Sequence, residues 1–76
     1  MLKKDALKGK KISIIGAGVS GRALAELAVK LGGSVFVSDS KSIAAETEEF
    51  FSSLGISWES NGNTARALDA DILVVG

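Results

Sequence analysis

The sequence predicts an α/β fold in which helices cover both faces of a four-stranded parallel sheet. Short apolar runs alternate with segments whose apolar residues recur at helical spacing, and glycines stand where one kind of segment gives way to the other. Apolar strands between amphipathic helices are typical of a parallel sheet with right-handed crossovers. The 76 residues are enough for one domain at most.

The first half of the chain holds two predicted strands and the helix that joins them. Lys11–Ile15 is short and rich in β-branched residues, as in a buried strand. From Ser20 to Leu31 the apolar residues follow one helix face, and two glycines then end the helix. Ser34–Ser38 is the second apolar strand.

The second half continues the order β-α-β-α-β-α-β with shorter elements. We predict a helix over 43–54, a strand over 56–59, a brief helix capped by Asn63 or Thr64 that runs through 68, and a strand over 71–75. The chain stops at Gly76, directly after a strand. In such sheets the loops after the strands carry the binding residues, so we expect residues 1–76 to be a fragment of a longer protein.

Composition excludes several kinds of chemistry. The chain has no cysteine and no histidine, which removes thiolate chemistry, the commonest metal ligand and the usual general base. The acidic residues Glu46, Glu48 and Glu49 read as one solvated helix face, and Asp69 and Asp71 as surface residues. We therefore predict no catalytic residue and no metal site. The lack of cysteine fits a reducing compartment such as the cytoplasm.

Nine basic and nine acidic residues cancel, but they are unevenly distributed. Residues 1–11 carry five lysines against Asp5. Such a basic segment can bind nucleic acid or a membrane surface, but no aromatic residues alternate with the lysines to stack on bases. No apolar run is long enough to span a bilayer. We interpret the segment as a solvated lead-in, and expect neither nucleic acid nor membrane as a partner.

The stretch IIGAGVSG, residues 14–21, places three glycines between the first strand and the first helix. We expect Gly16 to make the turn out of the strand, Gly18 to let backbone touch a phosphate, and Gly21 to let the helix pack against the strand. A helix N-terminus offers free N–H groups to an anion. Ser20 would either donate to that anion or cap its own helix. The structural alternative is a tight turn that binds nothing.

Asp39 ends the second predicted strand, where a carboxylate can accept from the ribose diol of NAD or FAD, or from the N–H edge of a base. Its charge disfavours the 2′-phosphate of NADP. Flavoproteins share the wording GAGVSG, but they usually follow the second strand with a glutamate and an Arg/Gly-rich turn, which VFVSDSKSIAAETEE lacks. The structural alternative for Asp39 is a cap on the next helix.

Four segments in order, GAGVSGRALA, VFVSDSK, FFSSLGISWESNG and ADILVVG, resemble the N-terminal domain of Mur ligases, and most closely the branch that adds D-glutamate. The resemblance covers residues 8–76. It implies a Rossmann-like domain that binds the UDP part of UDP-N-acetylmuramoyl-L-alanine in peptidoglycan synthesis. The substrate-binding residues that it implies are Gly18, Val19, Ser20, Gly21, Asp39, Ser40 and Lys41.

By family role, the backbone around Val19 and Ser20 would hold the diphosphate. Asp39 would read the uracil ring, Ser40 would add a backbone contact, and Lys41 would cover the base. Uracil has an N3–H donor that suits a carboxylate, and a diphosphate suits a helix N-terminus.

The resemblance also implies a parent ligase that uses ATP and Mg²⁺ in the cytoplasm. The ATP site of the family is a separate P-loop, and the 76 residues contain no G-x-x-x-x-G-K-[ST]. We therefore expect no cofactor in this chain and no ligase activity from it alone. Two alternatives remain open: an NAD- or FAD-binding domain of an oxidoreductase, and a nucleotide-sensing module such as those that regulate potassium channels. The sequence predicts no oligomeric state.

Overall fold

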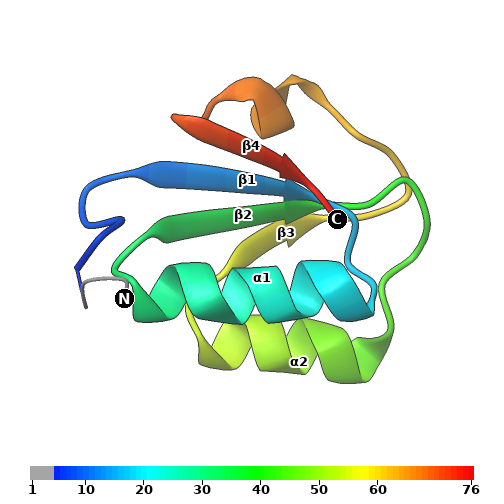
Figure 1. Ribbon diagram of the computed structural model, residues 1–76. Coiled ribbons are helices and arrows are strands. Elements are labelled where there is room, and N and C mark those ends of the chain that lie inside the picture. Colours follow the sequence, from blue (N-terminus) through cyan, green and yellow to red (C-terminus); the bar gives the residue numbers. More distant parts are fainter. Residues whose placement is uncertain (1–4) are drawn as a thin grey trace.

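The computed structural model describes residues 5–76 as a four-stranded parallel sheet with the strand order β3-β2-β1-β4 (Figure 1). Its elements match the predicted order of an α/β, Rossmann-like fold. The elements are β1 (Lys11–Ile15), α1 (Val19–Lys30), β2 (Ser34–Ser38), α2 (Ala45–Ser53), β3 (Ser57–Glu59), the 3₁₀ helix η1 (Ala65–Leu68) and β4 (Ile72–Val75). Part of the basic lead-in, residues 1–4, lies outside the described residues.

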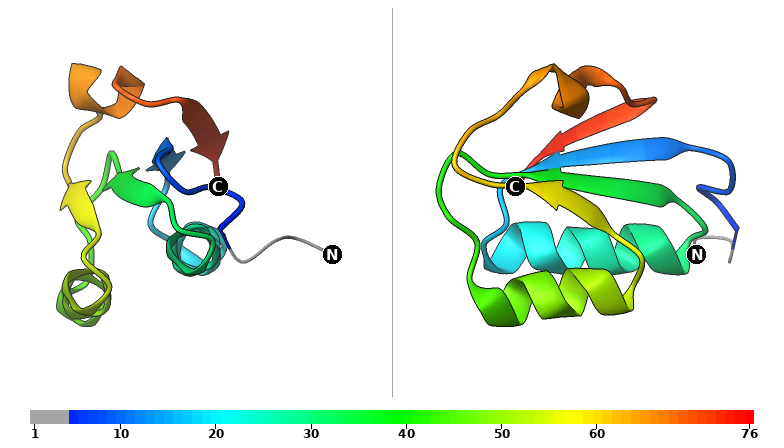
Figure 2. Two further views of the ribbon diagram at one scale, coloured as in Figure 1. Left: turned by 90° about the vertical axis from the view of Figure 1, so that its left-hand side faces the viewer. Right: turned by 180° about the vertical axis from the view of Figure 1, so that it is seen from behind.

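Helices cover both faces of the sheet, as predicted. The helices α1 and α2 lie side by side on one face, and η1 lies on the other (Figure 2). The core forms between the sheet and the two α-helices, because the side chains of each strand alternate between the faces. Its buried residues are Ile12, Ile14, Ala25, Ala28, Val35, Val37, Phe51 and Ile56.

The face toward η1 is more polar than the face toward α1 and α2. It carries Ser13 and Ser38, both almost fully buried, and Phe36, whose ring lies 4.7 Å from the guanidinium carbon of Arg66. Among the described residues, the hydroxyl of Ser13 is a buried side-chain oxygen without a hydrogen-bond partner. The four-residue η1 therefore covers a surface on which serines replace the apolar side chains of the opposite face.

Several predicted boundaries differ from the structure by one or two residues. The helix predicted over 20–31 is α1 (Val19–Lys30), and the strand predicted over 71–75 begins at Ile72. The helix predicted over 43–54 begins later, at Ala45, and Ile43 precedes it while still packing against the core. The strand predicted over 56–59 begins at Ser57, although Ile56 is buried. In the last two cases an apolar residue of the connecting segment packs against the core, Ile43 partly buried and Ile56 fully, so the apolar pattern extends beyond the regular element.

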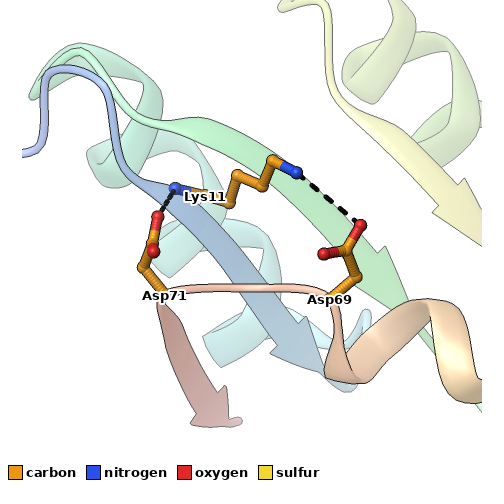
Figure 3. A network of polar contacts seen from close by, with 3 residues as sticks. All are labelled: Lys11, Asp69 and Asp71. Atoms are coloured by element: carbon orange, nitrogen blue, oxygen red, sulfur yellow. Dashed lines mark hydrogen bonds and ion pairs between the residues drawn. The ribbon is translucent and has the colours of Figure 1, made fainter.

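The start of β4 is fastened to the start of β1 by Asp71 (Figure 3). Its Oδ2 accepts a hydrogen bond from the backbone N–H of Lys11 at 2.8 Å, and its own N–H donates to the Lys11 carbonyl at 2.8 Å. The ammonium of Lys11 lies 3.6 Å from Asp69 Oδ2, and both of these side chains are mostly exposed. Asp69 and Asp71 are surface residues, as predicted, but Asp71 also sets the register of β4 against β1.

We predict that Asp71→Ala destabilises the fold and Asp69→Ala does not. The first substitution removes the acceptor of the Lys11 N–H, which should cost about 0.5–1.5 kcal/mol. The second removes only a solvent-exposed ion pair, which should change the free energy of unfolding by less than about 0.5 kcal/mol. Denaturant unfolding of both variants measures the difference, and equal effects would contradict the role of Asp71.

Candidate functional site

The turn after β1 depends on two glycines. Gly16 has φ +108°, a conformation that L side chains rarely adopt. A Cβ on Gly21 would lie 1.8 Å from the Gly16 carbonyl oxygen, which no real Cβ tolerates. The role predicted for Gly16, the turn out of the strand, is confirmed. Gly21 lets the helix pack against the strand, as predicted, since a Cβ would also lie 3.6 Å from Ile14 Cγ2, but the closest approach is to the turn at Gly16.

Gly18 differs from these two glycines. It has an ordinary extended backbone, with φ −72° and ψ −167°, and no heavy atom lies within 4 Å of the position of an added Cβ. The protein's own packing thus does not require a glycine here. The space beside the backbone is open, as an approaching phosphate would need.

The N-terminus of α1 is open to solvent. Gly18 occupies the N-cap position, and no side chain among the described residues caps the helix. The interpretation of Ser20 as an N-cap is wrong, because Ser20 is the second residue inside the helix. Val19 and Ser20 are both exposed, and the N–H groups of a first helical turn have no partners within the helix. Backbone donors and the Ser20 hydroxyl are therefore available to an anion.

Asp39, directly after β2, bridges two loops with its carboxylate. Its Oδ2 accepts from the backbone N–H of Ala17 at 2.8 Å, and its Oδ1 accepts from the N–H of Lys41 at 2.9 Å. The alternative role as a helix cap is wrong, because the N-cap of α2 is Ala44. A carboxylate offers about four lone-pair sites, so the half-buried Asp39 keeps acceptor capacity for a ligand.

The backbone N–H groups of Lys41 and then Ala17 hold the pKa of Asp39 below its ordinary value, because they bond the charged form. The carboxylate is therefore ionised at neutral pH. Ser40 and Lys41 follow it on the surface, both exposed.

The predicted site residues gather at one edge of the sheet. Gly18–Gly21 follow β1, and Asp39–Lys41 follow β2, so both segments lie where the carboxyl ends of neighbouring strands meet (Figure 1). The geometry thus places a carboxylate beside an uncapped helix N-terminus. This arrangement can accept hydrogen bonds from a base or a ribose and donate hydrogen bonds to a phosphate group.

A third segment lies at this edge and was not singled out from the sequence. The loop after β3 contacts the loop after β2: the N–H of Asn61 donates to the Lys41 carbonyl at 3.0 Å, and the N–H of Gly62 donates to the Asp39 carbonyl at 3.2 Å. The run Ser60–Asn63, a cluster of turn-forming residues after a parallel strand, is the signal that could have indicated it.

The remaining carboxylates are structural or exposed. Glu48 accepts a hydrogen bond from Trp58 Nε1 at 3.2 Å, so the prediction of a wholly solvated face over 46–49 is wrong for Glu48. Trp58 lies on the edge strand β3 and packs against the core. Within residues 5–76, no group of three His, Cys, Asp or Glu side chains could hold a metal ion, and no helix is long and apolar enough to cross a membrane.

Comparison with known proteins identifies the family. A family model described as the MurD N-terminal domain matches residues 11–76. The chain belongs to the MurD N-terminal domain family. Its relatives include the UDP-N-acetylmuramoylalanine--D-glutamate ligase of Chlorobium limicola, 51% identical over 67 residues that cover 88% of this chain and 14% of the relative.

Two further relatives carry the same name. The enzyme of Thermosipho africanus is 35% identical over 86% of this chain and 15% of its own length, and that of Salinibacter ruber is 35% identical over 93% of this chain and 15% of its own length. The chain therefore spans only 14–15% of the length of these three relatives.

The fold of this chain is similar to that of a flavoprotein. A solved structure, the HOCl-induced flavoprotein disulfide reductase RclA from Escherichia coli, matches with a TM-score of 0.71 and 16% sequence identity. The match covers 87% of this chain and 21% of that chain. At this identity the likeness concerns the fold alone.

We predict opposite outcomes for alanine at two neighbouring glycines. Gly21→Ala should destabilise the fold by about 3 kcal/mol or more, because backbone must move to admit the Cβ. A domain of this size has roughly 3–5 kcal/mol in all, so much of this variant should be unfolded. Gly18→Ala should change stability by less than about 1 kcal/mol. Thermal melts followed by circular dichroism test the pair, and a folded Gly21→Ala with a wild-type melting temperature would contradict the close approach.

We also predict that stability decreases in acid because of Asp39 and Glu59. The hydrogen bond from the Thr64 hydroxyl, and after it the one from the Thr64 backbone N–H, lowers the pKa of Glu59. Backbone N–H groups lower the pKa of Asp39 in the same way. A carboxylate whose pKa is lower in the folded state contributes its full stabilisation of the fold at a pH above its ordinary pKa of about 4. It loses this contribution as the pH falls through its folded-state pKa. As the pH is lowered below about 5, the denaturant concentration at the unfolding midpoint should decrease. The decrease should be less steep in the double variant Asp39→Asn/Glu59→Gln. Parallel curves would rule out this assignment.

Proposed function

We propose that this chain is the substrate-binding domain of a cytoplasmic ligase that adds D-glutamate to UDP-N-acetylmuramoyl-L-alanine in peptidoglycan synthesis, and that its own task is to bind the UDP part. Family membership and the names of the relatives support the parent activity. The observation that carries the proposal is the hydrogen bond from Ala17 N–H to Asp39, because it puts a base-reading carboxylate beside the glycine loop.

The diphosphate binds at the N-terminus of α1. Free N–H groups at Val19 and Ser20 and the positive end of the helix dipole favour an anion there. Gly18 leaves room for the phosphate, since nothing lies within 4 Å of a Cβ at this position. The exposed Ser20 hydroxyl adds a donor.

The uracil binds along the loop after β2. Its N3–H donates to a remaining lone pair of Asp39, a backbone group of Ser40 adds a second contact, and the exposed Lys41 side chain covers the ring. Because Asp39 is already held by two backbone N–H groups, its carboxylate does not have to be ordered when the nucleotide binds. This preorganisation lowers the entropic cost of binding.

The residues of this chain do not fit ATP or Mg²⁺. The sequence lacks a P-loop, and the described residues lack a metal-ligand cluster. Activation of the substrate by ATP and the joining of D-glutamate therefore belong to other parts of the proposed parent enzyme.

An NAD- or FAD-binding domain of an oxidoreductase is the second candidate. The observation that favours it is Asp39, whose carboxylate suits a ribose diol as well as a base. The two candidates differ in the nucleotide that binds more tightly.

Titration of the chain with UMP, UDP and NAD, followed by amide chemical shifts, separates them. We expect UDP to bind more tightly than NAD, with shifts at residues 16–21 and 39–41. Asp39→Asn should weaken UMP binding roughly ten- to a hundredfold, because it replaces a charged acceptor worth about 1.5–3 kcal/mol. Glu46→Gln, an exposed substitution of the same kind on α2, is the matched control. Tighter binding of NAD than of UDP would reject the proposal.

A further inference from the structure

The loop after β3 fixes the backbone of the proposed base-binding loop. Asn61 and Gly62 donate their N–H groups to the carbonyls of Lys41 and Asp39, at 3.0 and 3.2 Å. The N–H of Asp39 in turn donates to the Glu59 carbonyl at 3.1 Å. Three backbone hydrogen bonds therefore continue the pairing of β2 and β3 beyond the ends of the strands.

A single carboxylate closes the loop after β3 on itself. Glu59 Oε2 accepts from the N–H of Thr64 at 2.8 Å, and Glu59 Oε1 accepts from the Thr64 hydroxyl at 2.5 Å. The residues between them, Ser60–Asn63, form a loop whose two ends are joined by one side chain. These contacts fix the conformation of the loop, which includes Asn61 with a φ of +60°, an angle that is uncommon for residues other than glycine.

The same carboxylate also reaches the residue before Asp39. The fully buried hydroxyl of Ser38 lies 2.7 Å from Glu59 Oε2 and 2.6 Å from Asn63 Oδ1, and it shares its one proton between these two acceptors. Glu59 thus contacts the base-binding loop from its N-terminal side, while the loop after β3 contacts it through the carbonyls.

We propose that Glu59 is a positioning residue for the nucleotide base: it does not touch the nucleotide, and it holds Ser60–Asn63 so that this loop fixes Asp39 and Lys41. The proposal rests on the proposed function. It assigns a role to a residue that is not among the substrate-binding residues implied by the family resemblance, and it makes the loop after β3 part of the uridine site.

A positioning role and a purely electrostatic effect of Glu59 predict opposite changes in nucleotide affinity when Glu59 is removed. Glu59 is negatively charged, and so is a uridine nucleotide, so loss of the charge alone would strengthen binding. A positioning role requires the opposite, because Glu59→Ala frees the loop that holds Asp39. Glu59→Gln should restore binding, since a glutamine can accept from Thr64 N–H through its oxygen and donate to the Thr64 hydroxyl through its amide nitrogen.

The experiment compares Glu59→Ala, Glu59→Gln and the control Glu49→Ala, which removes an exposed carboxylate from α2. Each is titrated with UMP and with inorganic pyrophosphate. We expect Glu59→Ala to weaken UMP binding about fivefold or more, and Glu59→Gln and Glu49→Ala to stay within about twofold of wild type. Pyrophosphate affinity should not fall in any of the three variants, because the helix N-terminus is untouched and loss of a negative charge does not weaken anion binding. Amide exchange at Asn61 and Gly62 should be faster only in Glu59→Ala.

The outcomes separate the two proposals. If wild type binds no uridine nucleotide, the proposed function fails, and the role of Glu59 fails with it. If wild type binds UMP and Glu59→Ala binds it as tightly or more tightly, only the role of Glu59 fails. If Glu59→Ala does not fold, Thr64→Val and Thr64→Ser replace it: the valine should weaken UMP binding, the serine should not, and equal affinities would overturn the proposal.

Discussion

The structure depends on one close approach between backbones, that of the first turn of α1 to the turn after β1. It is possible because Gly21 has no Cβ to meet the Gly16 carbonyl and because Gly16 can adopt φ +108°. The approach sets the direction of α1 against the sheet and leaves its N-terminus at the edge where β1 and β2 end. It also brings the backbone N–H of Ala17 close enough to donate a hydrogen bond to the Asp39 carboxylate. The helix terminus and the carboxylate therefore become parts of one site.

Much of the fold was predictable because its signals are local. β1 and β2 have the predicted bounds, since each is a run of apolar and β-branched residues bounded by turn formers. The brief helix capped by Thr64 was also predicted correctly, and the hydroxyl of Thr64 accepts from Arg66 N–H. Glycine spacing between a strand and a helix likewise indicated Gly16 and Gly21, because their roles concern neighbours within a few residues.

The rest could not be predicted because it consists of side-chain contacts between segments far apart in the chain. That Asp39 would reach Ala17, or that Glu59 would reach Ser38, depends on how segments that follow different strands meet. Glu48 appeared solvated because helical spacing shows only which face it occupies and not that Trp58 lies opposite. The interpretation of Ser20 as an N-cap also failed: a serine is a favoured cap, but the N-cap is Gly18, two residues earlier, and the helix begins at Val19.

The uncapped N-terminus of α1 has a consequence for how such a site tolerates change over generations. A ligand held by backbone N–H groups does not depend on the side chains that those residues carry. Val19, whose side chain is 90% exposed, can be exchanged for many others without loss of the donors beneath it. The geometric constraint falls instead on Gly16, with its positive φ, and on the buried Gly21, where a Cβ would meet backbone. At the helix terminus, the side chain of Val19 would thus be free to change, whereas the two glycines that shape the turn would not.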